Sequence, residues 1–190
     1  MGEHIREIIL TTRRADGTAH IAPMGVRERG DQLLIAPFRP SSTLDNLLRS
    51  RSAVVNLTDD VRVYAGCLTG HYDWPLLPAE RIDGVRLRDA LAHQELEVAR
   101  VEEDATRPRL FCRVVGELNH RPFRGFNRAQ AAVLELAILV SRLDMLPRDK
   151  LERETEYLRI AMDKTAGERE WEAWGWLQEK LEGHRRRQCA

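Results

Sequence analysis

The sequence predicts a mainly β protein with a helical ending: an antiparallel barrel followed by a C-terminal helical part. In the first two-thirds, stretches rich in β-branched residues alternate with turn residues, which is typical of short strands. From Phe126 onward, apolar residues recur at helical spacing. Antiparallel strands with one short helix among them lose their exposed edges by closing into a barrel. We therefore expect a barrel domain over residues 1–122 and a helical subdomain over residues 123–190, packed on the barrel or on a dimer partner.

Two strand–turn–strand units open the chain. Ile5–Thr12 is a β-branched run that ends at the turn Ala15-Asp16-Gly17. A second strand, His20–Val26, is joined by Arg29-Gly30-Asp31 to a third, Gln32–Pro37. Turn residues between short strands predict an antiparallel meander.

A short capped helix follows the meander. Hydroxyl residues end the segment Pro40–Thr43, and Leu44, Leu47 and Leu48 come next at helical spacing. A hydroxyl before the first turn accepts from amides that have no partner inside the helix, and Asp45 complements the helix dipole.

The middle of the chain returns to strands. Ala53–Thr58 has strand character, and Val61–Cys67 either extends the sheet or turns helical. We expect a loop over Gly70–Gly84, because this stretch has no clear period. Glu95–Glu102 and Arg109–Leu118 complete the predicted sheet.

Three helices are predicted in the last third. The first is amphipathic, begins near Ala129 and ends at Leu146-Pro147. Leu151–Ala161 and Glu168–Leu181 follow, each with one strongly charged face.

Charge and cysteine content exclude several classes of protein. Thirty basic residues balance thirty acidic ones, so nothing favours nucleic acid as a partner. Cys67, Cys112 and Cys189 lie far apart, which suggests neither a zinc site nor a disulfide framework, and His20 and His120 lack the spacing of metal ligands. The longest apolar stretch, 129–140, is too short to cross a bilayer, and the N-terminus lacks a signal-peptide pattern. We expect a cytoplasmic protein without membrane contact or metal.

The predicted helix start resembles a phosphate site in its chemistry. Arg39, Ser41, Ser42 and Thr43 cluster before the helix, and Asn46 lies one turn further on the same side. An arginine fork, hydroxyl groups and free helix-terminal amides are the groups that bind phosphate. A hydroxyl run before a helix is also an ordinary N-cap, so a structural role stays open.

A strand one hairpin earlier ends in Ala22-Pro23-Met24-Gly25. Proline removes an amide and glycine removes a side chain, so the backbone here admits a flat ligand closely. An edge strand has the same features, and only the two segments together favour a binding site.

These segments resemble the FMN-binding split-barrel superfamily, which includes flavin reductase-like and pyridoxamine-phosphate-oxidase-like proteins. The resemblance rests on His20-x-Ala22-Pro23-Met24-Gly25, Ser42-Thr43-x-x-Asn46-Leu47 and Val54-Val55-Asn56, in that order. Phe126-Asn127-Arg128-Ala129 and the apolar helix after it are similar to a prokaryotic family known as domain of unknown function 447. Its members carry this barrel and a C-terminal helical part.

The resemblance implies FMN as cofactor. Ser42 and Thr43 would contact its phosphate with help from Asn46, and the reductases have Asp where this chain has Ser42. The remaining implied contacts are Pro23, Met24 and Gly25 along the ring, and Asn56 and Thr58 at the ring or ribityl chain.

The resemblance also implies a flavin-dependent oxidoreductase that works as a homodimer. No side chain is marked as a catalytic acid or base, and the substrate and electron donor stay unassigned; a nicotinamide or a deazaflavin-type donor is compatible. A carrier or sensor that binds FMN without turnover is an alternative. A structural dimeric protein with a vestigial site is another.

Other residues have both functional and structural interpretations. The cluster His71-Tyr72-Asp73-Trp74 either covers a flavin face or packs on a partner. Arg128, Glu135 and Arg142 share a helix face, either as a charge ladder across a subunit interface or beside the phosphate, or as solvated charges. Trp171 and Trp174 are predicted packing anchors, and exposed indoles in this helix favour a dimer.

Overall fold

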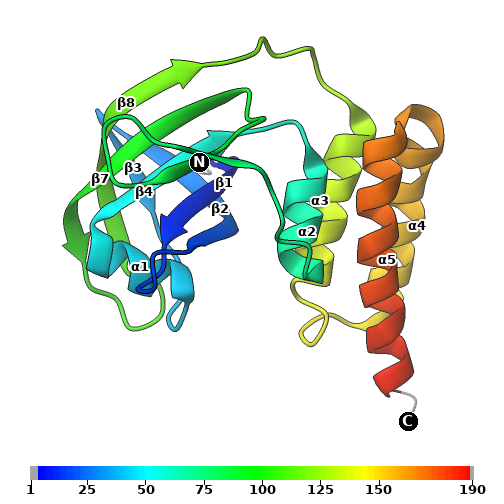
Figure 1. The fold of residues 1–190 in the computed structure, drawn as a ribbon. Coiled ribbons are helices and arrows are strands. Elements are labelled where there is room, and N and C mark those ends of the chain that lie inside the picture. The colour runs from blue at the N-terminus through cyan, green and yellow to red at the C-terminus, as the bar shows by residue number, and fades with distance from the viewer. Residues whose placement is uncertain (1–3, 189–190) are drawn as a thin grey trace. The chain divides into compact units, whose positions relative to one another are not determined.

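The computed structural model describes residues 4–188 and contains two compact units (Figure 1). Within these residues, the first unit comprises 4–58 and 74–123, and the second comprises 59–73 and 124–188. Cys189 lies outside the described residues.

The first unit is a closed, six-stranded antiparallel barrel, which confirms the predicted fold. The strands follow one another around it in the order β1-β2-β3-β8-β7-β4. Their bounds are Arg6–Arg13 (β1), Ala19–Arg29 (β2), Gln32–Ile35 (β3), Ser52–Leu57 (β4), Ala92–Glu102 (β7) and Arg109–Asn119 (β8).

The inward-facing side chains of the strands fill the barrel interior. Ile8, Leu10 and Val55 are among its buried residues, and Leu96 lies with them. Their neighbours Ile9 and Asn56 point outward but are equally buried, because a hairpin covers β1 and β4 from outside. Both faces of these two strands are therefore enclosed.

That hairpin, residues 76–87, is called the strap below. It consists of β5 (Leu76–Pro78) and β6 (Val85–Leu87). The prediction of a loop over Gly70–Gly84 was therefore wrong for β5. Prolines and the short strand length hid its strand character from the sequence pattern.

Helix α1 (Ser42–Ser50) is the predicted capped helix. Leu44 and Leu47 are almost fully buried in the barrel core, which fixes the helix to the barrel. Its N-terminus lies at Ser41, the N-cap residue.

Helix α2 (Val61–Thr69) resolves the stretch that the sequence left open between strand and helix. Val61 and Ala65 are buried in the helical core, so residues 59–73 group with the second unit and not with the barrel. A single domain boundary at residue 122 cannot assign α2 to the helical unit, because α2 lies between barrel strands in the sequence.

The second unit contains three more helices: α3 (Arg128–Val140), α4 (Arg148–Thr165) and α5 (Glu168–Gln188). Their apolar faces, with Leu136, Leu177 and Trp174 nearly inaccessible, make a second hydrophobic core. Trp174 is thus the packing anchor that its spacing predicts, whereas Trp171 remains partly exposed with the Arg159 guanidinium over its ring at 4.8 Å.

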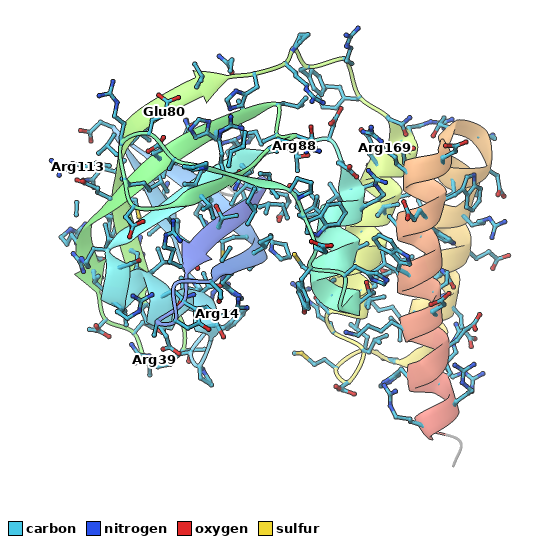
Figure 2. The ribbon with its side chains drawn as sticks, viewed as in Figure 1. Arg14, Arg39, Glu80, Arg88, Arg113 and Arg169 are labelled. Atoms are coloured by element: carbon cyan, nitrogen blue, oxygen red, sulfur yellow. The ribbon has the colours of Figure 1, made fainter. Side chains whose placement is uncertain are left out.

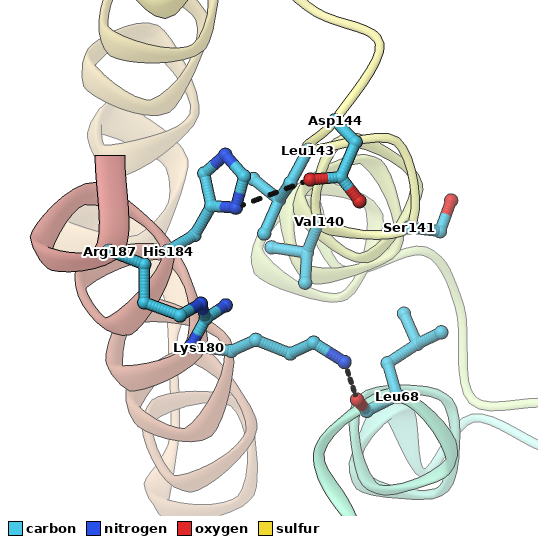
Figure 3. A pocket seen from close by; sticks show the side chains of 8 residues that line it. All are labelled: Leu68, Val140, Ser141, Leu143, Asp144, Lys180, His184 and Arg187. Carbon is cyan, nitrogen blue, oxygen red and sulfur yellow. Dashed lines mark hydrogen bonds and ion pairs between the residues drawn. The ribbon is translucent and has the colours of Figure 1, made fainter.

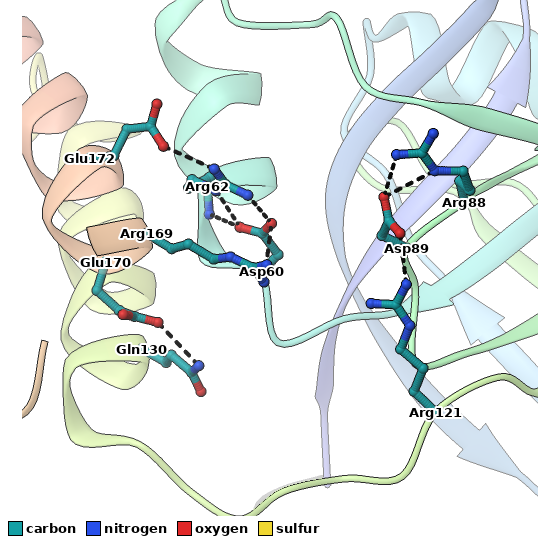
Figure 4. Close-up of polar contacts among 9 residues, drawn as sticks. All are labelled: Asp60, Arg62, Arg88, Asp89, Arg121, Gln130, Arg169, Glu170 and Glu172. Carbon is teal, nitrogen blue, oxygen red and sulfur yellow. Dashed lines mark hydrogen bonds and ion pairs between the residues drawn. The ribbon is translucent and has the colours of Figure 1, made fainter. Parts of the chain in front are cut away.

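Polar caps and ion pairs fix the ends of these helices. Asn127 caps α3, and its side chain accepts from the amides of Ala129 and Gln130. Asp60 caps α2 and binds Arg62 at 2.7 Å, and Arg62 reaches Glu172 on α5 at 3.0 Å (Figure 4). Among the described residues, no helix is both long and apolar enough to cross a membrane.

Candidate functional site

The N-terminus of α1 carries donors that have no acceptor within the helix. The Ser41 hydroxyl oxygen accepts from the Leu44 amide at 3.3 Å, as an N-cap does. The amides of Ser42 and Thr43 occupy the first two helical positions, where the helix itself offers no acceptor. The exposed Ser42 hydroxyl lies beside them. Together with the helix dipole, these groups favour an anion.

The structure brings β2 and α1 together through one hydrogen bond. His20 Nε2 lies 3.0 Å from the Thr43 hydroxyl oxygen. Thr43 is only 4% exposed, and the second ring nitrogen of His20, Nδ1, lies 3.1 Å from Nη2 of Arg14. The two segments that suggest a site in the sequence therefore meet in space.

The charge state of His20 follows from this arrangement. Partial burial lowers the pKa of His20 below its usual value, and the nearby Arg14 cation lowers the pKa further. The imidazole is therefore neutral at physiological pH.

Arg39 lies near the same end of the barrel. Figure 2 shows Arg14 and Arg39 on the side of the barrel where α1 lies. The Arg39 guanidinium pairs with Glu103 at 3.0 Å, and both side chains are well exposed. Exposed pairs of this kind contribute little stability, so Arg39 can exchange Glu103 for an anionic ligand at small cost.

Asn46 is buried and faces β1. Its side-chain nitrogen donates to the Thr12 hydroxyl at 3.0 Å. This bond anchors α1 to the barrel, so the described structure gives Asn46 a supporting role rather than one at the helix end.

The middle of β2 holds the three residues expected along a flavin ring, because the strand does not end at Gly25 but continues to Arg29. Pro23 is partly buried, and the Met24 side chain packs against the barrel core. A Cβ on Gly25 would lie 2.8 Å from Cγ2 of Ile5. The missing side chain of Gly25 therefore makes room for this chain's own Ile5, which the sequence pattern did not reveal.

Asn56 is fully buried, and the protein itself satisfies its side chain. The nitrogen lies within hydrogen-bond distance of the Ile9 carbonyl at 3.1 Å and the Thr11 hydroxyl at 3.2 Å, and the oxygen accepts from the Leu87 amide at 2.7 Å. Asn56 thus ties the strap to β1 and β4. Thr58 is partly buried at the end of β4.

A second polar cluster, which sequence reasoning missed, lies on β7 and just after the end of β8. His93 Nδ1 lies 2.9 Å from His120 Nε2, and His93 Nε2 lies 3.2 Å from a Glu95 oxygen. Alternation along β7 places His93 and Glu95 on one face, which is the signal that identifies the pair. In the sequence, His120 was interpreted only as a residue that lacks the spacing of a metal ligand.

Glu95 binds the backbone of the strap. Its carboxylate accepts from the amides of Glu80 and Arg81 at 2.7 Å each and from Ile82 at 3.1 Å. Burial alone raises the pKa of Glu95, but these amides and His93 outweigh burial and lower the pKa below its usual value. Glu95 is therefore an anionic anchor.

Two members of the cluster 71–74, His71 and Tyr72, contact residues of the second unit. The His71 ring stacks on Trp176 with centroids 4.0 Å apart, and the Tyr72 hydroxyl donates to the Cys67 carbonyl at 3.1 Å. Arg128, Glu135 and Arg142 are exposed, and Arg142 lies beyond the end of α3.

A pocket of about 580 Å³ lies between the ends of the helices in the second unit (Figure 3). The Lys180 ammonium donates to the Leu68 carbonyl, and His184 Nδ1 lies 3.6 Å from Asp144. Because these charged groups are bound within the protein, the donors at the α1 N-terminus are the better candidate for an anion site.

Comparison with known proteins agrees with the barrel-plus-helices architecture. No curated protein matches the chain. Among solved structures, the FMN-bound DUF447 protein from Methanosarcina mazei is 19% identical, with a TM-score of 0.81 over 95% of this chain and 96% of that one.

Two further solved structures share the barrel. The 2-nitrobenzoate 2-nitroreductase of Pseudomonas fluorescens is 20% identical, with a TM-score of 0.53 over 63% of this chain and 66% of that one. The flavin reductase component of a bacterial tryptophan halogenase is 16% identical, with a TM-score of 0.52 over 63% of this chain and 83% of that one. At these identities the likeness shows the fold.

Two family descriptions match nearly the whole chain. The domain described as "protein of unknown function (DUF447) N-terminal domain" matches residues 6–121, and "protein of unknown function (DUF447)" matches residues 127–179. The chain therefore belongs to the DUF447 family.

Proposed function

We propose that this protein binds FMN on its barrel, with the phosphate at the N-terminus of α1. The observation that carries the proposal is the contact between His20 and Thr43, which joins the start of β2 to the start of α1. The similar DUF447 protein from Methanosarcina mazei is FMN-bound, which supports the same cofactor here.

The groups at the α1 N-terminus fit a phosphate dianion. The Ser42 and Thr43 amides point away from the helix, and the Ser41 and Ser42 hydroxyls can both donate. Arg39, which comes just before the helix, supplies positive charge nearby. Phosphate offers only acceptors, so a donor-rich end of a helix satisfies it.

We further propose that the flavin ring lies along the middle of β2. Pro23, Met24 and Gly25 would contact it through the backbone, since the Met24 side chain packs in the barrel core and Ile5 fills the space beside Gly25. For Asn56, whose side chain is used within the protein, we propose an indirect role through the strap. Thr58 stays a proposed ribityl contact and Asn46 a proposed support of α1.

The activity proposed for this site is that of a flavin-dependent oxidoreductase. Bound FMN would supply hydride or electron chemistry, and the chain would bind, orient and shield it. The flavin reductase and nitroreductase among the similar structures support this class. Reduction of the flavin-loaded protein by NADH or NADPH, followed at the flavin absorbance, tests turnover. If the bound flavin is inert toward every donor tried, the protein is a carrier or sensor instead.

We propose a homodimer as the working form. Trp171 and Tyr157 are partly or largely exposed on the helical unit, and large apolar side chains on a surface favour a partner. Light scattering during size-exclusion chromatography should give twice the mass of one chain. A mass equal to one chain, with FMN bound, would remove the dimer from the proposal.

FMN binding is tested first by the absorbance spectrum of the purified protein. We expect a flavin spectrum, or its appearance after FMN is added and excess is removed. A protein that stays colourless after FMN is added would show that the site is vestigial.

A further inference from the structure

The contact between Arg14 and His20 determines which ring nitrogen of His20 donates and which accepts, next to the proposed phosphate site. A guanidinium has donors only, so the His20 nitrogen that faces Arg14, Nδ1, must be the acceptor of their 3.1 Å contact. A neutral imidazole carries one proton, which therefore lies on Nε2. The opposite tautomer would place two donors against each other.

The proton on Nε2 determines what Thr43 can do. Nε2 is 3.0 Å from the Thr43 hydroxyl oxygen, and a protonated nitrogen donates to that oxygen. The oxygen is thus used as an acceptor, and the Thr43 hydroxyl proton is left for another acceptor. Thr43 lies at the second position of α1, beside the amides that have no acceptor in the helix.

We propose that His20 is a positioning residue for a phosphate monoester, held by Arg14 in the Nε2–H tautomer so that the Thr43 hydroxyl acts as a donor. This inference rests on the proposed function and adds two residues to it. Neither His20 nor Arg14 belongs to the set of expected cofactor contacts.

Two features favour this role over a purely structural one. The helix has independent anchors, since Leu44 and Leu47 are buried in the barrel core and Asn46 bonds to Thr12. Partial burial, and then the Arg14 charge, lower the pKa of His20, which keeps the ring neutral as the tautomer argument requires. The relay Arg14–His20–Thr43 therefore orients a hydroxyl rather than supplying a second positive charge.

The first test needs no ligand. A long-range proton–nitrogen correlation spectrum of the flavin-free protein identifies the tautomer of each histidine, and the signals that His20→Gln removes belong to His20. We expect the Nε2–H form. The Nδ1–H form, or a doubly protonated ring at neutral pH, would overturn the inference whatever the protein binds.

The second test compares FMN with riboflavin, which lacks the phosphate. His20→Leu should weaken FMN binding about tenfold, because the Thr43 hydroxyl is then no longer held as a donor and its charge-assisted hydrogen bond to the phosphate is lost. Riboflavin binding should stay unchanged. His20→Gln should restore FMN binding, because its amide can accept from Arg14 and donate to Thr43. In a Thr43→Val background, His20→Leu should have little further effect.

These outcomes separate the inference from the function it rests on. If the wild-type protein takes up no FMN, the proposed function fails, and the tautomer measurement still decides the arrangement of His20. If the wild type binds FMN and His20→Leu binds it equally well, the positioning role alone is wrong. A melting temperature of each variant close to that of the wild type shows that α1 stays in place.

Discussion

Thr43 is the residue on which the proposed phosphate site depends most. Its hydroxyl oxygen is engaged by His20, and its own proton and amide lie at the start of α1. Thr43→Ala removes a donor to a charged group, so we expect FMN binding to weaken by about 1–3 kcal/mol. Titration of flavin fluorescence measures the effect, and Thr43→Ser, which keeps the hydroxyl, is the matched control. Equal FMN affinity in the Ala and wild-type proteins would contradict the role of Thr43.

Asn56 has the strongest structural role of the expected site residues. Because Asn56→Ala would leave the Leu87 amide and the Ile9 carbonyl short of partners in a buried place, we expect it to cost about 2–4 kcal/mol of unfolding free energy. Urea denaturation measures the cost. The exposed Asn119→Ala is the control and should change stability very little. A negligible loss in Asn56→Ala would mean that the strap is held by other contacts.

The sequence predicts individual residues well where one local rule applies. A hydroxyl cap before α1 is expected from the sequence, and Ser41 is that cap, because capping depends on the next three residues only. The partners of His20 and Gly25 could not be predicted, since Thr43 and Ile5 reach them through strand pairing and helix docking. Long-range pairing of this kind leaves no spacing signal in one sequence.

Helices and strands, like single residues, are predictable where the local sequence determines them and not where distant contacts do. The barrel strands were predicted from β-branched runs and turn residues, and α1 was predicted from its capping hydroxyls and leucine spacing. The structure confirms them. Helix α2 stayed ambiguous because its apolar residues form a short run, which fits strand and helix equally. Strand β5 was predicted as part of a loop, because the strap is held by distant side chains such as Glu95 and not by a local pattern.

The strap should depend on the charge of Glu95. The folded protein lowers the pKa of Glu95 below its usual value of about 4.5, so the carboxylate stabilises the fold at pH above that value. That contribution is lost as pH falls through the lower folded-state pKa. We expect Glu95→Gln to destabilise the protein at pH 7, and the gap in unfolding free energy to the wild type to narrow as the pH falls below the usual pKa of a glutamate.

Hydrogen exchange locates this effect. In Glu95→Gln, the amides of Glu80, Arg81 and Ile82 should exchange faster than in the wild type, while those of α3 stay protected. Glu97→Gln on the same strand is the control, because Glu97 makes only an exposed pair with Arg113 at 3.0 Å. Unchanged protection of the strap would show that Glu95 does not hold it.

At the scale of the whole molecule, each unit has its own hydrophobic core. Leu136 is fully buried among the helices, so Leu136→Ala should cost about 2–5 kcal/mol. Because the proposed FMN site uses residues of the barrel unit only, FMN affinity should stay the same at temperatures where the protein is folded. Hydrogen exchange should show the loss in α2, α3 and α5, which pack together. A loss of FMN binding in this variant would place part of the site in the helical unit.

The central claim, a phosphate of FMN at the start of α1, is tested most directly by titrating the flavin-free protein with FMN and with riboflavin. We expect saturable binding of one FMN per chain, at least about tenfold tighter than riboflavin, with inorganic phosphate as a competitor, because the donors at the helix end act on the phosphate. Equal affinity for FMN and riboflavin, or no binding of FMN, would contradict the account.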